Sequence, residues 1–147
     1  MNFTRFLAGT ALALAYAGSA FAADTMSAAP AMPMSAPMDQ IVDDGGIQTV
    51  CTGVGSAKDD PQFQNWPAQI EFSNEGTQYL SGVHIVISKG GSVVRDSVCN
   101  GPWFLVKGPG TYTVKGSFEG MQDKSGSFSG DGPHKRVVLQ FAKAPNQ

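Results

Sequence analysis

Histidine is the side chain that most often activates a nucleophile near neutral pH, so it decides first whether this chain could be an enzyme. The sequence contains two histidines, His84 and His134. His84 lies in an apolar run, out of phase with the neighbouring isoleucines, whereas His134 follows Gly132-Pro133 in an expected loop. No G-x-S-x-G, H-E-x-x-H or S-x-x-K motif accompanies them. The sequence therefore predicts structural or solvated histidines and a protein that is not an enzyme.

Carboxylates occur in two adjacent pairs, Asp43-Asp44 and Asp59-Asp60. Both pairs lie in expected loops, where aspartates usually contact solvent or cap a turn. Their spacing matches no calcium-binding loop of the D-x-D-x-D-G type. Neither pair therefore predicts acid–base catalysis or a calcium site.

Methionines cluster ahead of the apolar runs, at Met26, Met32, Met34 and Met38. Thioethers are soft ligands that suit Cu(I), and Met32 and Met34 have a Met-x-Met spacing. With Met38 and either His84 or His134 as further donors, a copper site of low coordination number can be drawn. The alternative is that an Ala-, Pro- and Ser-rich segment acquired its methionines without a function. Copper is thus the one cofactor that the sequence suggests, and a periplasmic copper-binding protein is the alternative function.

Three aromatic residues, Trp66, Trp103 and Phe104, suggest a binding surface. Adjacent residues of a strand face opposite sides of a sheet, so Trp103 and Phe104 cannot both point into one core. The outward-facing ring could contact an unknown envelope protein or a glycan. Alternatively, a covering loop could bury it.

The N-terminus predicts export. Arg5 precedes an uncharged apolar run from Phe6 to about Ala17, and Ala20 and Ala22 occupy the positions that a signal peptidase recognises. These features are typical of a secretory signal peptide, here residues 1–22. The apolar run is shorter than the ~20 residues that a membrane-spanning helix needs. We therefore expect a periplasmic or secreted protein with no integral membrane segment after cleavage.

The charge balance argues against nucleic acid as a partner. The chain has 10 Lys and Arg against 12 Asp and Glu, and only Arg5 precedes the expected cleavage, so the remainder has a net charge of −3. Such a chain has no basic cluster to attract a phosphate backbone.

Residues 23–45 are expected to form a disordered linker rich in Ala, Pro and Met, followed by one folded domain over residues 46–143. Deletion of residues 23–40 should then leave the fold intact. The domain carries two cysteines, Cys51 and Cys99. In an oxidising compartment an even pair is most simply a disulfide, and a redox-active pair would more usually be spaced C-x-x-C. We predict a structural disulfide.

Seven short runs of β-branched and aromatic residues indicate strands, at 47–51, 68–72, 83–88, 93–98, 103–106, 111–118 and 135–142. In the sixth run Tyr112 and Val114 alternate with Thr111 and Thr113, which predicts one buried face and one wet face. No stretch of ten or more residues has helical periodicity. The sequence therefore predicts an all-β, antiparallel β-sandwich of about seven strands. A closed barrel is the alternative fold.

One phrase in this region resembles a known signature. Gly108-Pro109-Gly110-Thr111-Tyr112-Thr113-Val114 is similar to the P-x-G-x-Y-x-V strand of carboxypeptidase regulatory-like (transthyretin-like) domains. Gly82–Ile87, followed by a turn at Gly90-Gly91, resembles a further strand of those domains. Cys51–Gly55 and Asn100–Leu105 resemble phrases in a group of uncharacterised exported proteobacterial proteins with the same fold.

The resemblance spans residues 51–141, although Lys107-Gly108 stands where the family often has Leu-Pro. It implies a prealbumin-like sandwich and carries no established activity with it. Together with the absence of catalytic motifs, it favours a non-enzymatic periplasmic β-sandwich module that acts through binding or as an envelope accessory protein.

Overall fold

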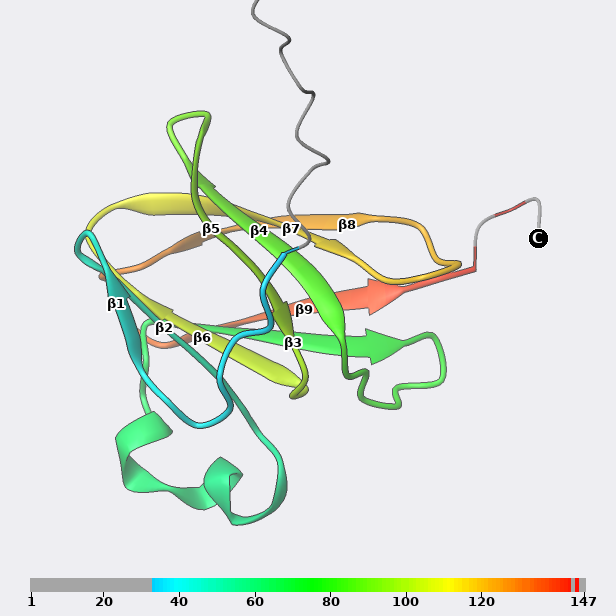
Figure 1. Ribbon diagram of the computed structural model, residues 1–147, viewed down its shortest axis with the longest axis horizontal. Coiled ribbons are helices and arrows are strands. Elements are labelled where there is room, and N and C mark those ends of the chain that lie inside the picture. The colour runs from blue at the N-terminus through cyan, green and yellow to red at the C-terminus, as the bar shows by residue number, and fades with distance from the viewer. Residues whose placement is uncertain (1–32, 144, 146–147) are drawn as a thin grey trace, which may run out of the picture. The chain divides into compact units, whose positions relative to one another are not determined.

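In the described part of the chain, nine strands form two sheets that pack face to face (Figure 1). The computed structural model describes residues 33–143 and residue 145 of the 147. The larger sheet has the order β1-β2-β6-β3-β9 and contains β1 (Val42–Asp44), β2 (Ile47–Thr52), β3 (Ala68–Asn74), β6 (Trp103–Lys107) and β9 (Lys135–Phe141). The smaller sheet has the order β5-β4-β7-β8 and contains β4 (Val83–Lys89), β5 (Ser92–Cys99), β7 (Thr111–Ser117) and β8 (Lys124–Ser129). The predicted β-sandwich is confirmed.

Two strands and one pairing differ from the sequence-based prediction. β1 has three residues, two of them aspartates, and β8 carries a single large apolar side chain, Phe128, so neither shows the expected alternation. β9 pairs in parallel with β3, from Ala68 opposite Lys135 to Asn74 opposite Phe141. The chain crosses from the smaller to the larger sheet between β8 and β9, which prevents these two strands from forming a hairpin.

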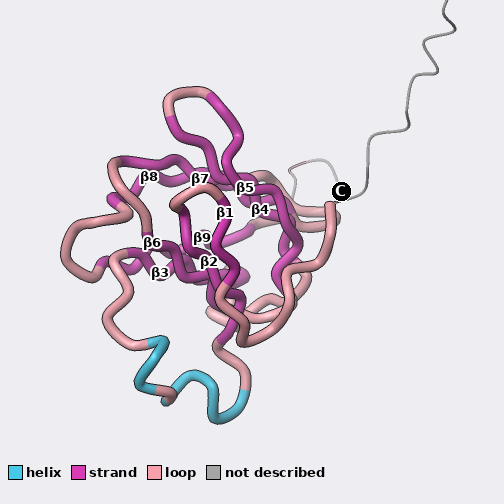
Figure 2. The backbone as a smooth tube through the Cα atoms, turned by 60° about the vertical axis from the view of Figure 1, so that its left-hand side comes forward, coloured by secondary structure: helices cyan, strands magenta, loops and turns pink. Residues whose placement is uncertain are grey.

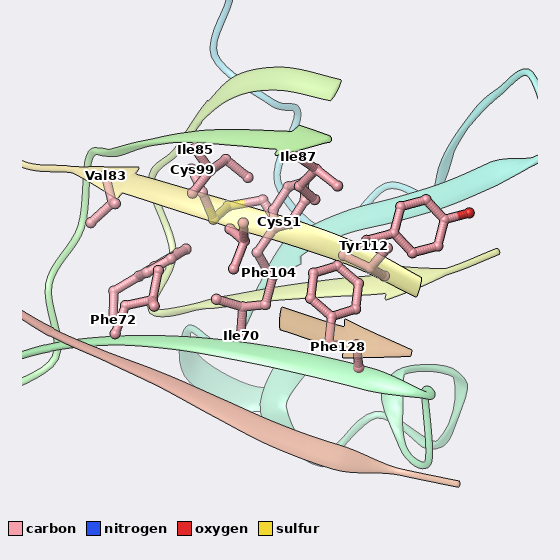
Figure 3. Close-up of a cluster of buried hydrophobic side chains, with 14 of the residues drawn as sticks. Cys51, Ile70, Phe72, Val83, Ile85, Ile87, Cys99, Phe104, Tyr112 and Phe128 are labelled. Atoms are coloured by element: carbon pink, nitrogen blue, oxygen red, sulfur yellow. A yellow bond between two sulfur atoms is a disulfide. The ribbon is translucent and has the colours of Figure 1, made fainter. Parts of the chain in front are cut away.

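The core lies between the sheets and follows the alternation of the strands (Figure 3). Its largest fully buried side chains are Phe72, Phe104, Phe141 and Ile70, which come from the larger sheet, and Ile85 and Ile87, which come from the smaller. Tyr112 and Val114 point inward, as predicted, while Thr111 and Thr113 are exposed. The Tyr112 ring stacks on Phe128 with 5.6 Å between centroids.

The predicted disulfide is confirmed. Cys51 of β2 and Cys99 of β5 are bonded and fully buried, and the bond joins the larger sheet to the smaller one (Figure 3). A buried disulfide of this kind is typical of proteins that fold in oxidising compartments.

Residues 34–39 form an N-terminal strap across the edge where this disulfide lies. Ala36 N donates to Val98 O of β5 at 2.8 Å, and Asp39 N donates to Cys51 O of β2 at 2.9 Å. Ala36 is buried, and Met38 packs on the core with its Sδ 3.4 Å from Cys51 Sγ. The structure therefore differs from the linker expected over residues 23–45, of which 23–32 lie outside the described residues. Backbone pairing, the burial of Ala36, the packing of Met38 and a hydrogen bond from Thr52 to Asp39 hold the strap, and none of these leaves a compositional signal.

Truncation at the strap should now affect stability. A chain that begins at residue 41 loses the strap's backbone hydrogen bonds and the burial of Ala36 and Met38, whereas a chain that begins at residue 32 keeps them. We expect the shorter chain to lose on the order of 2–3 kcal/mol of unfolding free energy, from one buried side chain and several hydrogen bonds. Urea unfolding of both chains measures the difference. Equal midpoints would show that the strap contributes nothing.

Candidate functional site

The predicted aromatic surface is divided between two sides of the larger sheet. Phe104 points into the main core and is fully buried. Trp103 lies on the opposite face, half-buried, beside a second cluster of Val50, Phe63, Trp66 and Leu105. The prediction that Trp103 and Phe104 face opposite sides is confirmed.

A covering segment buries this second cluster. It contains two 3₁₀ helices, η1 (Gly55–Asp59) and η2 (Pro61–Phe63), drawn in cyan in Figure 2. Within residues 33–143 and 145, no helix is long and apolar enough to span a membrane. Trp66 is 7% exposed, and its Nε1 donates to Gln62 O at 2.8 Å. Trp66 and Phe104 therefore offer little surface to a partner, and the accessible chemistry lies elsewhere.

A groove lined by both polar and apolar surface lies at the end of the sandwich where β2, β3, β7 and β9 begin; we call it the end groove. It consists of two adjoining hollows of about 470 Å³ and 300 Å³ that share Gln48, Pro67 and Lys107. The first hollow is also lined by Asp43, Pro109 and Asp131, and the second by Gln62, Gln64, Asn65 and Trp66. Four segments far apart in sequence thus meet here.

Lys107 occupies the centre of the end groove. It is the last residue of β6, its side chain is exposed, and its backbone stands opposite Gln48 of β2. Among the described residues, its ammonium group forms no ion pair or side-chain hydrogen bond, whereas both neighbouring aspartates are engaged. Asp43 accepts from Gln48 Nε2 at 3.3 Å, and Asp131 accepts from Gly110 N at 3.1 Å.

The turn beside the first hollow is held by Tyr112. Its hydroxyl donates to Pro109 O at 3.0 Å, and Lys89 Nζ donates to the same carbonyl. A Cβ on Gly108 would lie 2.6 Å from this hydroxyl, so only glycine fits there. Burial, together with the nearby Asp131, raises the pKa of Tyr112. The phrase from Gly108 to Val114 thus has a structural role, to bring a tight turn to the wall of the groove.

Asp131 is a firmly ionised carboxylate at one end of the groove. Hydrogen bonds from the Gly110 amide and the Ser129 hydroxyl lower its pKa. It therefore gives the first hollow a fixed negative charge at any physiological pH.

His84 lies on the smaller sheet, whereas His134 lies in the segment just before β9 of the larger sheet. His84 is on the outer face of the smaller sheet, with Nε2 2.6 Å from Asp96 Oδ1, and its backbone stands opposite Ser117. Among the described residues, no hydrogen bond joins the Ser117 hydroxyl to His84, so the two do not form a nucleophile–base pair. His134 precedes β9 and donates from Nδ1 to Trp66 O at 2.6 Å.

The structure does not gather the described copper donors. Met34 is 82% exposed, whereas Met38 packs on the disulfide, and Met32 lies outside the described residues. Residue Ser35 stands opposite Val98, which in turn stands opposite His84. By alternation Met34 then faces the other side of the sheet from His84.

Sequence reasoning missed the groove residues Gln48, Lys107 and Asp131. None of these residues belongs to a recognisable motif, and turns at separate places in the chain bring them together. A partial signal was available in Gln62, Gln64 and Asn65, three amides that directly precede Trp66.

No protein-family model matches this chain, and no curated protein matches it at a significant level. The resemblance to carboxypeptidase regulatory-like domains therefore stays a prediction that rests on the phrases quoted above.

Proposed function

We propose that this protein is a non-enzymatic module of the cell envelope, exported to the periplasm or secreted, and that it binds a glycan in the end groove. The observation that carries the proposal is the lining of the groove, where side-chain amides lie beside the accessible rings of Pro67 and Pro109. An amide offers both donors and an acceptor, which suits the paired hydroxyl groups of a sugar. The apolar ring surfaces suit the C–H faces of the same ligand.

The disulfide and the expected signal peptide support the compartment. Reducing compartments keep thiols reduced, so a pair like Cys51–Cys99 fits a protein that folds after export. Glycans are abundant in that compartment.

A binding experiment tests the proposal. The chain from residue 23, with its disulfide intact, is titrated with soluble envelope and plant oligosaccharides while backbone amide shifts are followed by NMR. We expect shifts at Gln48, Gln64 and Lys107, and an affinity about three- to tenfold lower in Gln48→Ala, which removes one hydrogen-bonding group.

Gln140→Ala is the matched control. Gln48 and Gln140 are both strand residues with one side-chain hydrogen bond each, of 3.3 Å and 3.2 Å, but Gln140 is on β9, outside the groove. Affinity in Gln140→Ala should equal that of the unchanged protein. Shifts confined to another face, or equal losses in both variants, would refute a glycan site in this groove.

A further inference from the structure

The end groove has an uneven distribution of charge. Lys107 is the one cation among the residues that line the two hollows, and it lines both of them. The two carboxylates of the groove, Asp43 and Asp131, line only the first hollow and already accept hydrogen bonds from the protein. The ammonium group of Lys107 is therefore the charged group of the groove that is available to a ligand.

We propose that the end groove selects an acidic glycan, in which one sugar carries a carboxylate that binds Lys107 and the neighbouring sugars are uncharged. This inference rests on the proposed function and adds the chemical class of the ligand. An ammonium group that lacks a protein partner gains a charge-assisted hydrogen bond when a carboxylate arrives. Gln48 stands opposite Lys107 on the adjacent strand and can donate to the second carboxylate oxygen.

The flanking groups set the spacing of charge along the ligand. Asp43 and Asp131 repel a second carboxylate in the first hollow, because both are anions in that space. The second hollow offers Gln62, Gln64 and Asn65, which suit uncharged hydroxyl and acetamido groups. A glycan with alternating acidic and neutral sugars fits this pattern, whereas a polymer with a carboxylate on every sugar does not.

Net charge cannot provide this selectivity. The exported chain is expected to carry −3 overall, so its long-range field repels polyanions. Recognition must therefore come from contact at Lys107, which is exposed in the groove.

Three tetrasaccharides of equal length test the inference by calorimetry: one with alternating glucuronate and N-acetylglucosamine, its carboxyl-reduced neutral form, and an oligogalacturonate. We expect the alternating ligand to bind at least tenfold more tightly than either of the others. Lys107→Gln should abolish the preference over the neutral form, and Lys107→Arg should retain it. Lys115→Ala, which removes an exposed lysine on β7 of the other sheet, should change nothing.

The outcomes separate this inference from the proposed function. Equal binding of the acidic and neutral forms leaves a glycan site standing and overturns the acidic specificity. Binding of the oligogalacturonate as tightly as the alternating ligand overturns the spacing. Failure of all three ligands, while a different neutral glycan binds, overturns the inference alone, and failure of every glycan overturns both.

Discussion

Replacement of both cysteines, Cys51→Ala with Cys99→Ala, should lower the free energy of unfolding by about 4 kcal/mol, because the bond closes a loop with a sequence separation of 48. The loop constrains the unfolded chain, which gains this entropy once the link is absent. A domain of this size has a total stability of roughly 5–15 kcal/mol, so the loss would remove between about a quarter and four fifths of it. Urea unfolding at 25 °C, followed by tryptophan fluorescence, measures the loss.

The unchanged protein, unfolded in urea with a thiol reductant, is the control for this prediction. It should reproduce the midpoint of the double variant, because reduction removes the same link without altering the side chains beyond the sulfur atoms. A difference below about 1 kcal/mol between the oxidised protein and the double variant would show that the loop model does not apply to this chain.

Phe104→Ala should cost about 3–5 kcal/mol of unfolding free energy, whereas Trp103→Ala should cost about 1–2 kcal/mol. Phe104 is fully buried among the side chains of the main core, so its removal leaves a cavity. Trp103 is half-buried at the second cluster, and its Nε1 has no hydrogen-bond partner within the described residues. Truncation of Trp103 therefore also removes an unsatisfied donor, which offsets part of the packing that is lost.

Urea unfolding of the two variants, both with the disulfide intact, compares them directly. Because the residues are adjacent in one strand and similar in size, the comparison isolates the side of the sheet on which each lies. A larger loss for Trp103→Ala would mean that the second cluster, under the covering segment, stabilises the domain more than the main core does.

The sequence correctly predicted the features of the fold that depend on residues close together in the chain. The alternation around Tyr112 and Val114 and the opposite orientation of Trp103 and Phe104 follow from the period of a strand. The disulfide followed from the number of cysteines and the expected compartment. β8 was not predicted from the sequence because most of its residues are Ser and Gly. Such a strand is held by its pairing with β7 rather than by an apolar face of its own.

The candidate site could not be predicted in the same way. Its polar groups come from β1, β2, the end of β6, the segment before β3 and the turn after β8, and no periodicity links these positions. Lys107 is a candidate binding residue because of the groups around it, and the arrangement of those groups depends on the order of the strands. The sequence drew attention instead to residues of rarer types, of which Phe104, Trp66 and Met38 pack within the protein.

The strap and the last strand together determine how the molecule can be attached to something else. The strap meets the sandwich at Val98 and Cys51, and β9 ends at Phe141; the strand register places all three toward the end of the sheets remote from the groove. The strands between these ends are five to eight residues long, a span of roughly 20 Å. A carrier, tag or solid support joined ahead of the strap or after β9 would therefore leave the mouth of the groove accessible to a ligand.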